Sequence, residues 1–173
     1  ALTRVSPTTP CLAAVYACVR VLSETMASLP LAFYKPRAGG GKDLVGTDHW
    51  LVRLLTKRPN KYQNPFEFRE MLQGHLALRG NAFCEIISNS RGQITDLLPM
   101  HPDRITIEVI VGGDYRYIYT LPDGSKRILA RGDVWHLRGL SSDGIVGLSP
   151  IEVAKSVLGA SLAAQDYGNR FFA

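Results

Sequence analysis

The sequence predicts an α+β fold in which helices come first, an antiparallel β meander follows and a long capped helix ends the chain. Apolar residues recur at helical spacing through the first third of the chain and again after position 149. Between residues 81 and 138 the period falls to two, and turn residues separate short apolar runs. Strands and helices do not alternate as in a parallel α/β sheet, so we expect antiparallel pairing.

The first predicted helix follows a polar, unpatterned stretch. We expect residues 1–9 to form an N-terminal arm and residues 10–173 to form one domain. Pro10 begins the helix and Pro30 ends it, because proline is favoured in the first turn and disfavoured in a helix interior. Apolar residues spaced by three and four predict an inward face that consists of Leu12, Val15, Val19, Leu22, Met26 and Leu29.

Two more helices are expected before the strands begin. Asp48 is the expected cap of a short helix, and Asn64 begins a longer one that Gly80 ends. Asn64-Pro65-Phe66-Glu67 has the capping-box pattern, with an acid three residues after the cap. Residues 31–35 are a candidate strand, and 36–42 (PRAGGGK) suggest a hairpin tip. No Ser or Thr follows that lysine, so a phosphate-binding loop is not indicated.

The middle of the chain predicts six short strands. Asn, Gly, Pro and Asp occur between them in the pattern of tight turns. Because consecutive strands are joined by short turns, we expect them to pair in chain order as a meander. The expected strands are residues 82–88, 94–98, 104–110, 115–121, 126–130 and 134–137.

The last expected helix has a well-specified start. Gly144 and Gly147 supply the positive φ that the preceding loop needs. Ser149 is the expected N-cap, and Pro150 at the first helical position has no amide hydrogen to leave unpaired. We expect the helix to continue to the end of the chain, which therefore reads as a piece of a longer protein.

Composition indicates a globular domain. The 173 residues include 46% hydrophobic and 20% charged residues, with a net charge of +5, and the first two values are typical of a folded chain and not of a disordered one. No apolar run has the length of a membrane span, and no secretory signal begins the chain, so we expect no membrane partner. Cys11 and Cys18 lie about 10 Å apart on one predicted helix, too far to bridge. We expect reduced thiols in a cytosolic compartment.

The sequence offers little for catalysis or metal binding. The four histidines, in different predicted elements, lack the spacing of metal ligands, and we expect neither a metal nor a cofactor. Cys84 and His136 are the one nucleophile–base pair to consider. Cys84 lies in mid-strand and not at an exposed helix N-terminus, so nothing local supports that pair.

Two features could contact nucleic acid. Tyr115, Tyr117 and Tyr119 share one face of a predicted strand, where they could stack on bases or pack across strands. A group of cations lies around the end of the short helix and in the loop after it, where it could contact phosphates or complement the helix dipole. This group consists of Arg53, Lys57, Arg58 and Lys61.

Three blocks of sequence resemble the HK97-type family of tailed-phage portal proteins, in the same order and over roughly residues 14–172. The blocks are AVYACVRVLSETMASLPLAFYK, then GNAFCEII with GQITDLLPMHPDRITI, then GDVWHLRGLSSDGIVGLSPIEVAK with AAQDYGNRFF. Five residues of the last block match the family pattern. They are Asp143, Gly144, Gly147, Ser149 and Pro150.

The resemblance implies the wing-forming N-terminal part of a portal subunit, in a family whose members form dodecameric rings at one capsid vertex. The implied partners are further copies of the chain, the major capsid protein, the large terminase and the head–tail adaptor. Double-stranded DNA would pass through the channel without sequence specificity. The implied location is the virion, after assembly in the host cytoplasm, and the resemblance implies no catalytic residue.

The sequence departs from the family at its end. It stops at Ala173, where family members continue into the stem and clip, so we expect a wing truncated before those parts. The five matching residues are then expected to form a loop and helix cap that orient the helix leading to the stem. The alternative is a nucleic-acid-binding α+β module that uses the cation group and the tyrosine strand.

Overall fold

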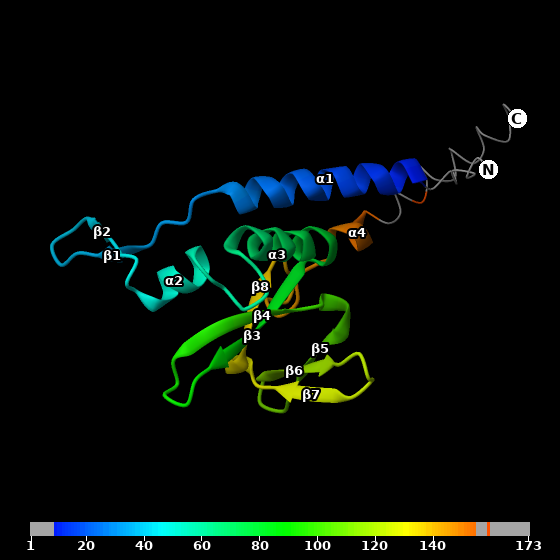
Figure 1. The fold of residues 1–173 in the computed structure, drawn as a ribbon. Coiled ribbons are helices and arrows are strands. Elements are labelled where there is room, and N and C mark those ends of the chain that lie inside the picture. Colours follow the sequence, from blue (N-terminus) through cyan, green and yellow to red (C-terminus); the bar gives the residue numbers. More distant parts are fainter. Residues whose placement is uncertain (1–8, 155–158, 160–173) are drawn as a thin grey trace, which may run out of the picture.

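The computed structural model describes residues 9–154 and residue 159, and it shows a layered α+β arrangement (Figure 1). Helix α1 (Thr9–Ser28) lies over α3 (Pro65–Arg79), and α3 covers the first of two three-stranded sheets. The short helix α2 (Trp50–Thr56) lies beside that sheet. The mixed α+β class expected from the sequence is confirmed.

The helices begin at the expected capping residues, except that His49 takes the place of Asp48 as the N-cap of α2. At α3 the Asn64 side chain accepts from the Glu67 amide at 2.9 Å, and the Glu67 carboxylate accepts from the Asn64 amide at 2.9 Å. Gly80 ends α3 with a φ of 70°. At α2 the cap is His49 and not Asp48, because the His49 Nδ1 atom accepts from the Leu51 amide at 3.3 Å. An imidazole nitrogen can take the acceptor role that was expected of a carboxylate.

The buried face of α1 is narrower than its apolar pattern predicts. Ser23 and Ala27 are buried against α3, while Leu22, Met26 and Leu29 remain about half exposed. A Cβ atom built on Gly74 of α3 would lie 3.6 Å from the Ser23 Oγ atom. The helices therefore approach through their smallest residues, which leaves the longer apolar side chains beside the contact. The expected inward position of Leu12 lies outside the residues whose side chains are described.

The glycine-rich segment forms the expected hairpin. Strands β1 (Tyr34–Pro36) and β2 (Lys42–Leu44) pair antiparallel, and Gly39, Gly40 and Gly41 between them all have positive φ. The first strand begins three residues later than expected, at residue 34. Its side chains are exposed throughout, so this hairpin projects away from the core.

The remaining strands form two three-stranded antiparallel sheets and not one meander. One sheet has the order β4-β3-β8 and the other has the order β5-β6-β7. Strand β8 returns to pair with β3 and does not extend β7, with Cys84 opposite Trp135. The strands are β3 (Asn81–Ser88), β4 (Ile94–Met100), β5 (Ile105–Val109), β6 (Tyr115–Thr120), β7 (Lys126–Leu129) and β8 (Val134–Arg138).

Strand β3 is central because both of its faces are apolar. Cys84 faces a core under α3 that includes Phe68 and Leu72. Phe83, one residue earlier, faces a second core that includes Tyr117 and Met100. A strand buried on both faces needs a neighbour along each edge to pair its backbone, which explains why β8 pairs here.

The final helix begins where the sequence predicts. Helix α4 is described over Pro150–Val153, and the Ser149 Oγ atom accepts from the Glu152 amide at 3.3 Å. The continuation expected as far as residue 173 lies outside the described residues. Within the described ranges no helix combines the length and hydrophobicity needed to cross a membrane.

We predict that Gly74→Ala stabilises the protein. Gly74 lies in the interior of α3, where alanine is favoured over glycine by about 0.5–1 kcal/mol. The added methyl would make an ordinary van der Waals contact with Ser23. Urea unfolding should show a higher midpoint with an unchanged slope, and a lower midpoint would mean that the helices cannot accept the methyl.

Candidate functional site

The loop that leads into α4 is fastened to the junction between α3 and β3. The buried Asn81 side chain makes two bonds to Gly147: Oδ1 accepts from its amide at 2.7 Å, and Nδ2 donates to its carbonyl at 2.8 Å. The Gly139 amide donates to the Gly80 carbonyl at 2.8 Å. The Ser149 hydroxyl donates to the Leu78 carbonyl at 2.9 Å. We call the contact of residues 78–81 with residues 139–149 the joint.

Two glycines allow the backbones of the joint to touch. A Cβ atom on Gly147 would lie 2.0 Å from the Gly80 oxygen, and one on Gly80 would lie 2.0 Å from the Leu148 oxygen. The sequence suggested that Gly147 supplies a positive φ, but among the loop glycines the structure gives that conformation to Gly144, at 72°. Gly147 is required by close approach and not by its backbone angle.

Asp143 shapes the loop itself. Its Oδ1 atom accepts from the Ile145 amide at 2.8 Å and from the Val146 amide at 2.9 Å. These backbone bonds, first Val146 and then Ile145, hold the pKa of the carboxyl below its usual range. The carboxylate organises a turn that ends at Ser149 and Pro150, the first residues of α4.

A hydrogen-bond chain links the joint to the second sheet. The Tyr117 hydroxyl lies 3.2 Å from His136 Nδ1, and His136 Nε2 lies 3.0 Å from Asn81 Oδ1. That oxygen already accepts from Gly147, so we assign the proton to Nε2 and have Tyr117 donate to Nδ1. Burial, with a smaller effect of Arg138, lowers the pKa of His136 to about 4. The imidazole is therefore neutral and structural at pH 7.

Cys84 and His136 do not form a nucleophile–base pair. Phe83 is the cross-strand partner of His136, and Cys84 is the partner of Trp135, so Cys84 and His136 point to opposite faces of the sheet. Cys84 is fully buried, and burial raises the pKa of its thiol to about 12.

The tyrosine strand faces the core and offers no stacking platform. Tyr117 is 1% exposed and meets the Phe83 ring edge-on, with centroids 5.9 Å apart. Tyr115 and Tyr119 are partly buried against the same cluster. Of the two interpretations of this stripe, the structure favours cross-strand packing.

The histidines do not gather into a metal site in the part of the chain that the structure describes. His75 and His101 lie closest, with ring centroids 5.8 Å apart. His49 and His101 each accept a backbone amide at a helix start. Their chemistry is that of caps and packing.

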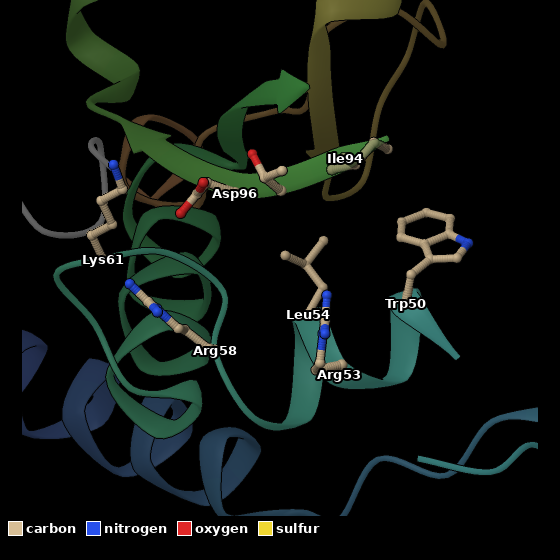
Figure 2. A pocket seen from close by; sticks show the side chains of 8 residues that line it. Trp50, Arg53, Leu54, Arg58, Lys61, Ile94 and Asp96 are labelled. Carbon is tan, nitrogen blue, oxygen red and sulfur yellow. The ribbon is translucent and has the colours of Figure 1, made fainter. Parts of the chain in front are cut away.

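A groove between α2 and the edge of β4 is lined by Arg53 of α2 and by Arg58 and Lys61 of the loop after it (Figure 2). Its volume is about 430 Å³, and a neighbouring cavity of about 420 Å³ shares part of its lining and reaches the β3–β4 turn. Three of the four cations that the sequence analysis grouped together line this groove. The fourth, Lys57, is the C-cap of α2 and is not part of the lining. The groove is lined by Trp50, Arg53, Leu54, Arg58, Lys61, Ile94, Thr95 and Asp96.

A buried anchor holds the loop that carries Arg58 and Lys61. Between them, Pro59 and Asn60 are almost fully buried. The Leu97 amide donates to the Pro59 carbonyl at 2.8 Å, and Asn60 Nδ2 donates to the Leu97 carbonyl at 3.0 Å. The loop therefore occupies the edge of β4 and fixes the backbones from which both cations project.

The groove carries a net positive charge. Arg53, Arg58 and Lys61 are exposed, and none of them takes part in an ion pair within the described part of the chain. Asp96 is the acidic residue of the lining, on the β4 side of the groove (Figure 2). The arrangement suits an anionic ligand that can tolerate one carboxylate nearby.

Sequence reasoning missed the two asparagines that build these sites. Asn60 and Asn81 lie in a turn and at a strand start, where asparagine is common for local reasons. Their decisive partners, Leu97 and Gly147, are 37 and 66 residues away in the sequence. Only the fold brings those partners together.

Comparison with known proteins identifies the family. The model of the phage portal protein family matches residues 13–173. The chain belongs to the phage portal protein family. It is 33% identical over 159 residues to the portal protein of Enterobacteria phage HK97, covering 92% of this chain and 37% of that protein. The HK97-type resemblance found in the sequence is thus confirmed.

Two further similarities agree. The chain is 36% identical over 172 residues to the probable portal protein of Streptomyces phage phiC31, covering 92% of this chain and 36% of that protein. Its fold matches a chain from the neck of a native gene transfer agent particle computed with C12 symmetry, with a TM-score of 0.68 and 23% identity. That match covers 96% of this chain and 41% of the other. This portal chain spans well under half the length of these relatives.

We predict that Gly147→Ala is strongly destabilising. The new methyl would overlap the Gly80 carbonyl and force the joint open, so the free energy of unfolding should fall by more than about 2 kcal/mol. Gly132→Ala is the matched control, because a Cβ there meets no atom within 4 Å. Urea unfolding of both variants checks this, and equal midpoints would contradict it.

We also predict a loss of stability at mildly acidic pH that depends on His136. Its folded pKa of about 4 lies below the ordinary value of 6.5, so the unfolded chain binds a proton more readily. The contribution of the neutral His136 to the free energy of unfolding is complete above pH 6.5, and it is lost as the pH falls toward 4. Unfolding free energies at pH 7 and 4.5 should therefore differ more in the wild type than in His136→Gln. Equal differences would show that another group, such as His75, is responsible.

Proposed function

We propose that the protein is a structural subunit of a phage portal ring at the capsid vertex. The observation that carries this proposal is the match of residues 13–173 to the portal family. The fold similarity to a chain of a particle neck supports it. Portal proteins are structural, and the proposal gives this chain no catalytic role.

A ring needs two different surfaces on each subunit, because a heterologous contact closes only by rotation. Exposed apolar side chains occur at separate places on this molecule. Leu22 and Met26 lie on α1, and Val109 and Val111 lie at the β5–β6 turn. These surfaces are candidates for contacts between neighbouring subunits. We propose twelve copies, the number that the resemblance to HK97-type portal proteins implies.

We propose the further partners by analogy with the family. We propose that the assembled ring contacts the major capsid protein, the large terminase and the head–tail adaptor. Double-stranded DNA would pass through its channel without sequence specificity. In this setting, the loop of Asp143, Gly144 and Gly147 and the cap of Ser149 and Pro150 would fix the direction in which the chain leaves the wing.

Native mass spectrometry of the protein expressed from its complete gene tests the proposal. We expect a closed oligomer of one copy number, twelve, that survives at physiological salt. Binding to a short DNA duplex, titrated with salt, provides the comparison with a nucleic-acid-binding module. A monomer that binds the duplex at physiological salt with a steep salt dependence would contradict the portal assignment.

A further inference from the structure

The groove between α2 and β4 has chemistry that ring formation does not require. We infer that this groove binds an acidic polypeptide segment of a partner protein. The inference depends on the side chains of the groove and not on the copy number of the ring. It would hold or fail even if the ring proposal were wrong.

Charge complementarity is the first argument. Arg53, Arg58 and Lys61 line one concave surface without ion-pair partners among the described residues. Two arginines can each grip a carboxylate through two parallel hydrogen bonds, and lysine adds a point charge. An anionic partner would supply the opposite charge that these cations lack.

The lining also offers an apolar strip. Leu54 is buried at the base of the groove, Ile94 is partly buried, and the indole of Trp50 is exposed (Figure 2). Polypeptides present carboxylates and aliphatic groups together, and aromatic and arginine residues are the usual anchors of protein interfaces. A segment that alternates acidic and aliphatic residues fits this lining.

The groove is preorganised. Arg53 lies on α2, and this helix is held against the protein by its buried side chains Val52 and Leu54. Arg58 and Lys61 flank the anchor at Asn60, whose Oδ1 atom accepts from the amides of Tyr62 and Gln63 at 2.9 Å. Because the backbone beneath the cations is already fixed, binding would cost little ordering of the protein.

The shape of the groove indicates an extended segment. Pro59 and Asn60 already lie along the edge of β4 at Leu97. The groove continues along the same strand from Asp96 to Ile94, and the neighbouring cavity reaches Gly92 and Asn89 in the turn. A peptide in extended conformation could lie along the edge of β4 from Asp96 toward Ile94, next to the part of that edge that residues 59–60 already occupy.

Nucleic acid fits the same groove less well. Asp96 in the lining repels any anion, but a peptide backbone amide could donate a hydrogen bond to it, whereas a phosphodiester has no donor. Proteins that bind a duplex insert a helix or ribbon into the DNA groove, whereas here the cations line a concavity of the protein. Single strands bind on rows of aromatic side chains. This lining has one aromatic residue, Trp50.

Fluorescence anisotropy with defined probes tests the inference. The probes are a labelled peptide of about eight alternating glutamate and leucine residues, the same peptide with lysine for glutamate, an oligothymidylate of similar length and a short duplex. We expect the glutamate peptide to bind more tightly than the other three. It should also change the tryptophan emission of the wild type and not that of Trp50→Phe.

Charge reversal supplies the matched variants. Arg53→Glu with Arg58→Glu should weaken binding of the glutamate peptide at least about tenfold, because the groove then repels it. Lys42→Glu with Lys126→Glu makes the same change in net charge at exposed positions outside the groove and should leave the affinity within about twofold. Urea unfolding verifies that both variants are folded.

Three results would overturn the inference. The first is a wild-type protein that does not bind the glutamate peptide. The second is an equal loss of affinity in both charge-reversed variants, which would show attraction by overall charge. The third is tighter binding of either oligonucleotide, which would assign the groove to nucleic acid.

Discussion

The contact on which most of the structure depends is the pair of hydrogen bonds between the Asn81 side chain and the Gly147 backbone. It joins the end of α3, the start of the central strand and the loop that leads to α4. Without a Cβ atom on Gly80 or Gly147, the two backbones come close enough for a side-chain amide to pair both groups of one residue. Through His136 the same asparagine is also linked to the buried Tyr117 of the second sheet.

Local features could be predicted from the sequence, and pairings between distant segments could not. The capping box at Asn64 and the cap at Ser149 consist of hydrogen bonds between residues within four positions of each other, so the local sequence predicts them. Strand β8 pairs with the edge of β3 that β4 leaves unpaired, and no local sequence pattern predicts that pairing. The prediction of the inward face of α1 was wrong for a similar reason, because the small residues Ser23 and Gly74 determine how closely α1 and α3 approach.

The candidate site divides in the same way. The sequence shows that Arg53, Arg58 and Lys61 lie near one another in the chain, but an exposed helix end would look the same. The groove exists because Asn60 fastens the loop to Leu97 of β4, 37 residues away. Conversely, the tyrosine strand looked like a possible surface, and the second sheet turns Tyr117 into the core. In both cases tertiary packing decides between interpretations that the residues leave open.

The protonation chemistry of the molecule separates its interior from its surface. Burial favours the neutral forms of Cys84, His136 and Tyr117, since it raises the pKa of the thiol and the phenol and lowers that of the imidazole. These groups support packing, and Cys84 is not held as the thiolate that a nucleophilic cysteine needs. The surface groove, by contrast, is lined by three cations without ion-pair partners among the described residues: Arg53 on α2, and Arg58 and Lys61 on the loop after it. The inference of peptide binding depends on this groove, whose lining combines the cations with an apolar strip.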